Sequence, residues 1–292
     1  MKIITLILFA FLFSCKNKNE LGSKENPVKF YLVPAQDRQA LLDNGEILKA
    51  YLEKELGLSF SVELPTNFVA VIEAFGSKRA DVALINTFGY IIAHDKYQVE
   101  ARLRVIDKGR DEYHGQIITR ADSSIKSVKD IDGKKFAYVD PASASGYLLP
   151  LGLFKKEHIK PKETIFAGRH DSVVTAVYSK QADAGATFYS PDNQDARKLV
   201  KTQFPDVYEK IKILELTGPI PNDPVIFRKD LPENIKNKII EALKKYVKMP
   251  EGAKVLHGMY HFTDLKNTTD KDYDTVRKYL TELGKTAEDF IK

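Results

Sequence analysis

The chain has 292 residues, of which 43% are hydrophobic and 29% are charged. That length and composition are typical of a soluble globular protein with one large domain or two ordinary ones. The formal charge of +5 comes from 45 basic and 40 acidic residues, scattered with no basic run of five or more. Proteins that bind nucleic acid concentrate positive charge on one element, so the sequence argues against a nucleic-acid partner.

The N-terminus has the pattern of a secretion signal. An apolar run from Ile3 to Phe13 follows a single lysine, and it is too short to span a membrane. The stretch Leu-Phe-Ser-Cys resembles a bacterial lipobox, although Phe13 is bulkier than the usual occupant. Cys15 is the only cysteine, which excludes a disulfide within the chain. We predict a signal peptide over residues 1–14, lipidation of Cys15 and a flexible tether over residues 15–26; an uncleaved anchor or a buried cysteine is the alternative.

From residue 29 onward, strand-like and helix-like segments alternate. The first series predicts strands at 29–35, 59–64, 81–85 and 99–106, with helices at 43–57, 67–79 and 87–97 between them. The second predicts strands at 116–121, 134–139, 164–168 and 184–188, with helices after Ser145 and at 171–181. A looser region over 190–210 precedes strands at 211–216 and 224–228 and a helical tail. This alternation is typical of βαβ units with parallel strands, and two series suggest two α/β lobes.

Motifs of several enzyme classes are absent from the sequence. It contains no G-x-S-x-G, H-E-x-x-H, C-x-x-C or G-x-x-x-x-G-K-[ST]. His257 and His261 stand four residues apart and could share a helix face, but no nearby carboxylate or cysteine supports a metal site. We therefore predict no metal, no cofactor and no catalytic residue.

One strand-to-helix corner consists of unusually small residues. Residues 139–150 read VDPASASGYLLP, with Ser143 and Ser145 set among alanines and a glycine. A helix N-terminus carries free backbone N–H groups and partial positive charge, so small residues there let an anion approach while serines add hydroxyl donors. The corner therefore predicts an anion site; the alternative is that one serine only caps the helix.

Three other corners have similar polar character. Residues 65–68 lead into a helix at Phe68, and residues 86–88 place Asn86 and Thr87 at the start of another. Helix capping explains these residues about as well as ligand contact does. His170 begins a further predicted helix, where the helix dipole disfavours its protonation and a neutral imidazole could donate a hydrogen bond.

Several stretches together resemble the substrate-binding proteins of phosphate, phosphite and phosphonate ABC transporters, of the phosphonate-binding type. The resemblance runs from Val28 to Leu283. It is carried by VPAQD, RADVALINTFGY, ITRADSSIKSVKDIDGKKFAYVDPASASGYLLP, FAGRHDSVVTAV, QADAGATFYSP and IPNDPVIFRKDLP, in that order.

The resemblance implies an α/β, type II periplasmic-binding-protein fold, whose two lobes enclose an oxyanion in a cleft. It implies that the family's serine-threonine-serine corner corresponds to Ser143, Ala144 and Ser145. It also implies ligand contacts at four further positions: Phe68, Tyr113, His170 and Asp223. From the residues alone, Tyr113 could instead pack at a hinge, and Asp223 could be a turn residue before Pro224.

Two departures from the family pattern bear on the ligand. Ala144 replaces a threonine and Phe68 replaces a tyrosine found in many members, so two hydroxyl donors are missing. Members that hold an aminoalkyl tail use a further carboxylate beyond the Gly-Ala-Thr stretch, where this chain has Ser190-Pro191 followed by Asp192. We therefore expect a small ligand: phosphite, phosphate or methylphosphonate.

These observations predict a monomeric, membrane-anchored lipoprotein on the periplasmic or extracellular face. Lobe 1 would comprise residues 27–114 and 222–292, lobe 2 residues 115–221, with a hinge near 114 and 222. Its partners would be a small phosphorus oxyanion, an ABC transporter permease with its ATPase, and the membrane through the lipid on Cys15. Alternatives are a ligand-sensing module, the same fold with another small anion, and a hydrolase that uses His170 and Asp223.

Overall fold

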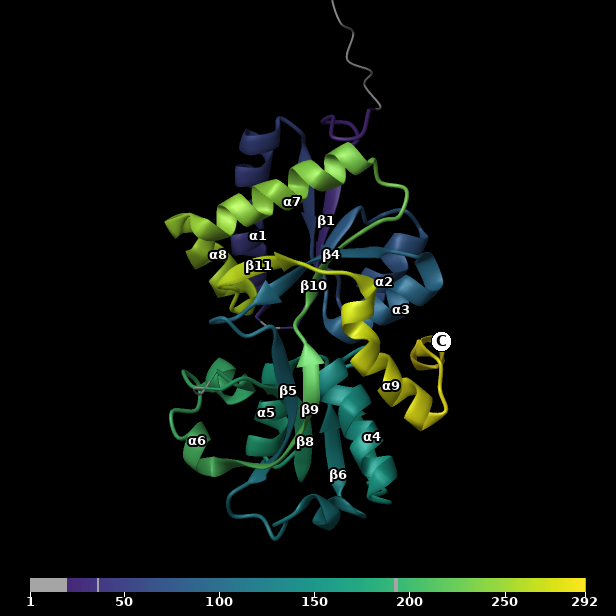
Figure 1. The fold of residues 1–292 in the computed structure, drawn as a ribbon. Helices are drawn as coiled ribbons and strands as arrows, with labels where there is room; N and C mark the ends of the chain where they lie inside the picture. Colours follow the sequence, from purple (N-terminus) through teal and green to yellow (C-terminus); the bar gives the residue numbers. More distant parts are fainter. Residues whose placement is uncertain (1–19, 36, 192–193, 292) are drawn as a thin grey trace, which may run out of the picture.

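The protein is built around two β-sheets, each flanked by helices (Figure 1). The computed structural model describes residues 20–35, 37–191 and 194–291. The first sheet has the order β11-β4-β10-β3-β1-β2, formed by β1 (Val28–Leu32), β2 (Phe60–Glu63), β3 (Val82–Leu84), β4 (Glu100–Ile106), β10 (Pro224–Phe227) and β11 (Asp264–Asn267). The second has the order β7-β6-β8-β5-β9, formed by β5 (Glu112–Arg120), β6 (Lys135–Tyr138), β7 (Glu163–Phe166), β8 (Ala184–Tyr189) and β9 (Ile211–Pro221).

We call the half around the first sheet lobe 1 and the half around the second lobe 2. Lobe 1 carries α1 (Arg38–Leu56), α2 (Phe68–Gly76), α3 (Thr87–Tyr97), α7 (Glu233–Lys248) and α8 (Pro250–Tyr260). Lobe 2 carries α4 (Leu149–Lys156), α5 (His170–Tyr178) and α6 (Val207–Lys210). Single helical turns are η1 (Val128–Ile131), η2 (Ala144–Leu148), η3 (Ala196–Val200), η4 (Asp270–Tyr273) and η5 (Ala287–Phe290).

Strand directions differ from the parallel pairing that the alternating pattern predicts. The pairs β1–β2, β1–β3, β6–β7 and β6–β8 are parallel. The strands that lead into or out of each lobe, namely β4, β5, β9 and β10, are paired antiparallel, as is β11. A strand that returns from the other lobe enters its sheet from the opposite end, which a local pattern of hydrophobic residues does not reveal.

The chain crosses between the lobes from β4 to β5 and again from β9 to β10. Asn222 ties these two crossings together. Its Nδ2 donates to the carbonyl oxygens of Val105 over 3.1 Å and of Arg110 over 3.0 Å, and its backbone N–H donates to the carbonyl oxygen of Asp111 over 2.8 Å. The two crossing segments therefore lie side by side at one edge of the cleft.

The C-terminal segment makes a further pass from lobe 1 towards lobe 2. After β11, α9 (Asp274–Leu283) lies along α4 (Figure 1), and the Lys155 ammonium donates to the carbonyl oxygens of Glu282 and Leu283. The ring of Phe290 meets Phe88 of α3 edge-on at 5.1 Å and Tyr147 of η2 at 5.7 Å. Phe290 therefore contacts both lobes at once.

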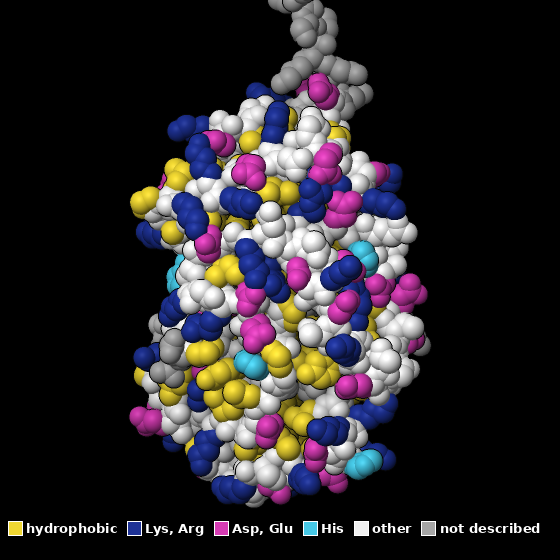
Figure 2. Space-filling model, in the orientation of Figure 1, with side chains coloured by type: hydrophobic (Ala, Val, Ile, Leu, Met, Phe, Trp, Pro, Cys, Tyr) yellow, Lys and Arg dark blue, Asp and Glu magenta, His cyan; other side chains and the backbone are white. Residues whose placement is uncertain are grey.

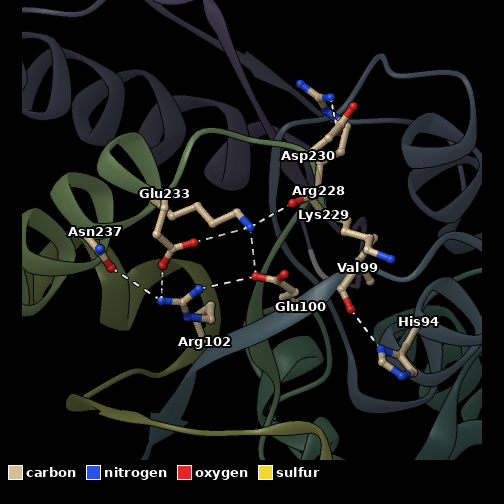
Figure 3. A network of polar contacts seen from close by, with 10 residues as sticks. His94, Val99, Glu100, Arg102, Arg228, Lys229, Asp230, Glu233 and Asn237 are labelled. Carbon is tan, nitrogen blue, oxygen red and sulfur yellow. Dashed lines mark hydrogen bonds and ion pairs between the residues drawn. The ribbon is translucent and has the colours of Figure 1, made fainter.

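A buried ammonium group fixes α7 against the first sheet. Lys236, only 2% exposed, donates to Glu100 over 2.8 Å and to the carbonyl oxygen of Lys229 over 3.0 Å. Figure 3 shows the surrounding contacts, in which Arg102, on the same strand β4 as Glu100, donates to Glu233 of α7 over 2.6 Å. A buried charge needs such partners to be tolerated, so this network holds the helix in one position.

On the face shown in Figure 2, acidic and basic side chains are interspersed over both lobes. In the part of the chain that the structure describes, no helix is long and apolar enough to cross a membrane.

Candidate functional site

A cavity of about 100 Å³ lies between the two lobes. Elements of both sheets and both crossing segments contribute to its lining, so the cavity depends on how the lobes meet. The lining residues are Ala35, Phe68, Asn86, Val105, Asp107, Tyr113, Ser143, Ser145, His170, Phe188, Ser190, Gln194, Asn222, Asp223, Tyr260, His261 and Phe262.

The serine corner forms the lobe 2 wall of the cavity. After β6, the chain makes a single π-helical turn, η2, before α4 begins. The hydroxyl oxygen of Ser143 accepts from the N–H of Gly146 over 3.1 Å, and the N–H of Leu148 donates to the carbonyl oxygen of Ser143 over 3.0 Å. Turns of this wide type are rare and are often found at functional sites. Here the turn holds Ser143 and Ser145, each 2% exposed, at the cavity wall.

The first crossing strand passes very close to this corner. A Cβ atom added to Gly115 would lie 2.8 Å from the carbonyl oxygen of Ser145, closer than real Cβ contacts, so β5 needs a glycine here. Two residues earlier, Tyr113 reaches the cavity beside Ser145. Burial, and secondarily the nearby Asp223, raise the pKa of Tyr113 well above its ordinary value, while the Ser145 side chain acts the other way. Tyr113 therefore keeps its proton and can donate a hydrogen bond.

His170 enters the cavity as the first residue of α5. It is 6% exposed, its Nδ1 lies 2.7 Å from the hydroxyl of Thr187 on β8, and its ring meets Phe188 edge-on. Burial lowers the pKa of His170 to about 3, so the imidazole is neutral at physiological pH. A neutral ring has one donor nitrogen and one acceptor nitrogen.

Asp223 lies on the second crossing, opposite the serine corner. Burial raises its pKa to about 7, and the hydrogen bonds from Thr87 partly offset this increase. The backbone N–H of Thr87 donates to Asp223 Oδ1 over 3.1 Å, which places this carboxyl group at the N-terminus of α3. The hydroxyl of Thr87 donates to the carbonyl oxygen of Pro221 over 2.6 Å. Thr87 thus orients Asp223 and the crossing segment, and it does not line the cavity.

The cavity has an unusual charge balance for an anion site. Its described lining contains the carboxyl groups of Asp107 and Asp223 and two histidines, but no lysine or arginine. Three buried polar atoms of this lining have no hydrogen-bond partner among the described residues: Asn86 Oδ1, Asp107 Oδ1 and His261 Nδ1. The site can therefore offer hydroxyl, amide and imidazole groups to a ligand, without a permanent positive side chain.

Seven of the nine predicted ligand residues line the same cavity: Phe68, Asn86, Tyr113, Ser143, Ser145, His170 and Asp223. Thr87 supports Asp223, and Ala144 is buried within the corner without lining the cavity. Their contact with a ligand stays a prediction. Cys15 and Asp192 lie outside the described residues.

Sequence reasoning missed the wall formed by the end of α8. Tyr260, His261 and Phe262 line the cavity, and the hydroxyl of Tyr260 donates to the carbonyl oxygen of Val33 over 2.7 Å. The sequence singled out His261 only because it stands four residues after His257. The centroids of these two rings are 5.2 Å apart. Across the described residues, no group of three or more His, Cys, Asp or Glu side chains is arranged to hold a metal ion.

Comparisons with known proteins agree with this architecture. The profile of a family described as ABC transporter, phosphonate, periplasmic substrate-binding protein matches residues 30–273. The phosphonates-binding periplasmic protein of Escherichia coli (strain K12) is 28% identical over 268 residues, covering 87% of this chain and 77% of the relative. The phosphate-import protein PhnD of Mycolicibacterium smegmatis is 30% identical over 170 residues, which is 53% of either chain.

Solved structures show the same fold. A binding protein component of an ABC phosphonate transporter from Pseudomonas aeruginosa has a TM-score of 0.78 at 22% identity, covering 88% of this chain and 86% of its own. PhnD1 from Prochlorococcus marinus, solved in complex with methylphosphonate, has a TM-score of 0.76 at 16% identity, covering 89% and 98%.

The predicted two-lobed α/β fold and the predicted family are thereby confirmed. The matching family consists of substrate-binding proteins that work with a membrane importer outside the cytoplasm, and not of enzymes. The chain belongs to the periplasmic substrate-binding proteins of phosphonate ABC transporters.

Proposed function

We propose that the protein is an extracytoplasmic lipoprotein that captures a small phosphorus oxyanion, namely phosphite, phosphate or a phosphonate, for an ABC importer. The observation that carries this proposal is the convergence of Ser143, Ser145, Tyr113 and His170 on one cavity, facing Asp223. Four groups that can donate hydrogen bonds to phosphorus-bound oxygens thus meet one group that can share a proton with the ligand.

The hydroxyls and backbone N–H groups of the corner would receive the oxygens at the start of η2, where a helical turn leaves its first N–H groups without acceptors. If Nδ1 of His170 accepts from Thr187, its Nε2 carries the remaining proton and can donate to the ligand. Tyr113 would add a third kind of donor. Uncharged donors in a buried site can hold an anion well because they need no reorganisation when it arrives.

Asp223 gives the site a preference among protonation states. A carboxylate facing a fully ionised oxyanion would repel it, whereas a protonated carboxyl group, or a ligand that brings its own proton, makes a hydrogen bond instead. With its pKa raised to about 7, Asp223 can supply that proton near neutral pH. The small cavity and the alanine at position 144 favour a ligand with no more than a short substituent.

Ligand capture would involve movement of the lobes, because the two walls of the cavity come from different sheets. We propose lobe 1 as residues 27–114 and 222–292, lobe 2 as residues 115–221, and the crossings near 114 and 222 as the hinge. A ligand that binds better between closed lobes shifts the open–closed equilibrium towards the closed form, which the permease then recognises. The predicted lipid on Cys15 would hold the monomer near that permease.

A thermal-shift panel tests the ligand proposal. The purified protein is heated with phosphate, phosphite, methylphosphonate, 2-aminoethylphosphonate or sulfate at matched ionic strength. A ligand at 100 times its dissociation constant stabilises the folded state by about 2.7 kcal/mol, which raises the melting temperature measurably. We expect at least one phosphorus oxyanion to do so and sulfate to do less; if none raises the melting temperature, the proposal fails.

A further inference from the structure

The serine corner of lobe 2 meets two helix N-termini of lobe 1. The Nδ2 of Asn86, the N-cap residue of α3, donates to the carbonyl oxygen of Ala142 over 2.6 Å in a buried position. Burial raises the pKa of Asp140, and the backbone N–H groups of Ala142 and of Phe68, the first residue of α2, act the other way. The contacts of Asn86 and Phe68 with this corner connect different lobes, so they are lost when the lobes separate.

Asp140 also shapes the corner itself. Its Oδ1 accepts from the N–H of Ala142 over 2.8 Å, and its carbonyl oxygen accepts from the N–H of Ser143 over 2.9 Å. The residue is 5% exposed and does not line the cavity. One carboxyl group therefore shapes the ligand corner on its own lobe and faces the N-terminus of α2 on the other, where the helix dipole favours a negative charge.

Apolar packing surrounds these bonds. Phe68 and Phe88 of lobe 1 belong to the same core cluster as Ala142, Ala144 and Leu148 of lobe 2. Asn86 does not use its side chain to cap α3, as an N-cap residue commonly does, but directs its amide to the other lobe. The contact thus has the properties of a protein interior, with polar groups paired and apolar groups excluded from water.

We propose that Asp140 is a positioning residue that couples the geometry of the serine corner to lobe closure, so that the closed form is well populated before any ligand binds. Asn86 is the second part of this interlobe contact. The inference goes beyond the choice of ligand and rests only on the lobe movement proposed above. Its consequence is that binding affinity depends on a side chain that does not touch the ligand, because only the closed fraction binds tightly.

The test measures the distance between the lobes without ligand. Spin labels are attached to cysteines that replace Glu241 of α7 and Asp122 of lobe 2, whose side chains are 75% and 66% exposed, in protein carrying Cys15→Ser. Asp140→Asn keeps the shape of the side chain and removes its charge. The matched control is Asp130→Asn, because Asp130 also accepts from backbone N–H groups, those of Lys126 and Ser127, but entirely within lobe 2.

We expect wild type and Asp130→Asn to give the same short-distance population and Asp140→Asn to move towards longer distances. In addition, methylphosphonate or phosphate should bind Asp140→Asn about tenfold or more weakly, mainly through faster dissociation, as expected when an interaction that exists only in the closed form is lost. Asn86→Ala, which leaves the corner intact, should lengthen the ligand-free distance as well.

Unchanged distance distributions in both Asp140→Asn and Asn86→Ala would overturn the proposal. If Asp140→Asn fails to fold, Asn86→Ala alone decides, by the ligand-free distance. The ligand proposal is tested separately by titrating labelled wild-type protein. A wild type that responds to no phosphorus oxyanion would contradict the proposed function, while the comparison of ligand-free variants would still be informative.

Discussion

At the scale of single residues, Ser145 is the most direct test of the anion site. The residue is 2% exposed and lines the cavity beside Tyr113. Ser145→Ala removes a hydroxyl donor to a charged ligand, so we expect binding to weaken by about 1–3 kcal/mol in isothermal titration calorimetry. Ser124→Ala, at an exposed serine of the same lobe, is the control and should change nothing. An unchanged affinity in Ser145→Ala would mean that this serine serves the helix and not the ligand.

Asp223 predicts a specific pH dependence of stability. Its pKa, raised to about 7 by burial, means that the folded state retains a proton that the unfolded state loses near its ordinary pKa. The stability due to this proton is complete below about pH 4 and is lost as the pH rises through about 7. Asp223→Asn has no carboxyl group here and does not lose this stability as the pH rises. The difference between its free energy of unfolding and that of wild type should therefore increase in favour of the variant by about 1–4 kcal/mol from pH 4 to pH 7.

Urea unfolding of both proteins at several pH values measures this difference. His170 has the opposite effect, because its pKa is lowered to about 3 and its buried neutral ring resists protonation in acid. That contribution is common to wild type and Asp223→Asn and cancels in the comparison. A difference that stays constant from pH 4 to pH 8 would show that Asp223 is ionised throughout.

Seven of the seventeen residues that line the cavity could be predicted, several of them because polar residues at the junctions between strands and helices can be recognised in the sequence. Asn86, Ser143, Ser145 and His170 each stand where a predicted strand gives way to a helix. Tyr260 and Phe262 do not, since they sit at the C-terminal end of a helix whose position depends on the antiparallel pairing of β11 with β4. Long-range strand pairing of that kind leaves no local signal in the sequence.

At the scale of elements, the helices were easier to place than their ends. The helix predicted at 43–57 begins earlier, at Arg38, where the side chain of Asp37 accepts from the N–H of Ala40. The helix expected directly after Ser145 is first a wide π turn and becomes α-helical only at Leu149. A hydrophobic pattern reports which face of a helix is buried, but it does not report the hydrogen-bond spacing within one turn.

Substitution by alanine should change the stability of the protein in opposite directions at two helical glycines. A Cβ atom at Gly252 of α8 would lie 1.9 Å from the carbonyl oxygen of Tyr246, so the backbone at the α7–α8 junction would have to move. A Cβ atom at Gly152 of α4 would have its nearest neighbour, Tyr279, at 3.7 Å. We expect Gly252→Ala to lower the free energy of unfolding by about 1–3 kcal/mol and Gly152→Ala to raise it by about 0.4–1 kcal/mol.

Denaturant unfolding of the two variants beside wild type checks this pair, and each variant is the control for the other. Equal effects of the same sign would contradict the argument, because only the local space around the added methyl group differs. Ligand affinity should be nearly unchanged in both, since neither glycine lines the cavity.

At the scale of the whole molecule, the predicted anchor decides where the protein works. Cys15→Ser removes the only thiol that could carry a lipid. We expect the variant to move from the membrane fraction to the soluble fraction of lysed cells, with its ligand-induced thermal shift intact. Ser14→Ala, which keeps the cysteine, is the control and should stay with the membrane. Retention of Cys15→Ser in the membrane fraction would contradict lipidation.

The position of Phe290 has a practical consequence for anyone who builds a biosensor from this protein. The ring of Phe290 contacts Phe88 on one lobe and Tyr147 on the other. A fluorescent protein joined directly after Phe290 would therefore crowd the interface between the two lobes. Such a fusion would disturb the lobe movement proposed above, which it was meant to report. Dyes on α7 and on the far end of lobe 2 would follow that proposed movement from outside the interface between the lobes.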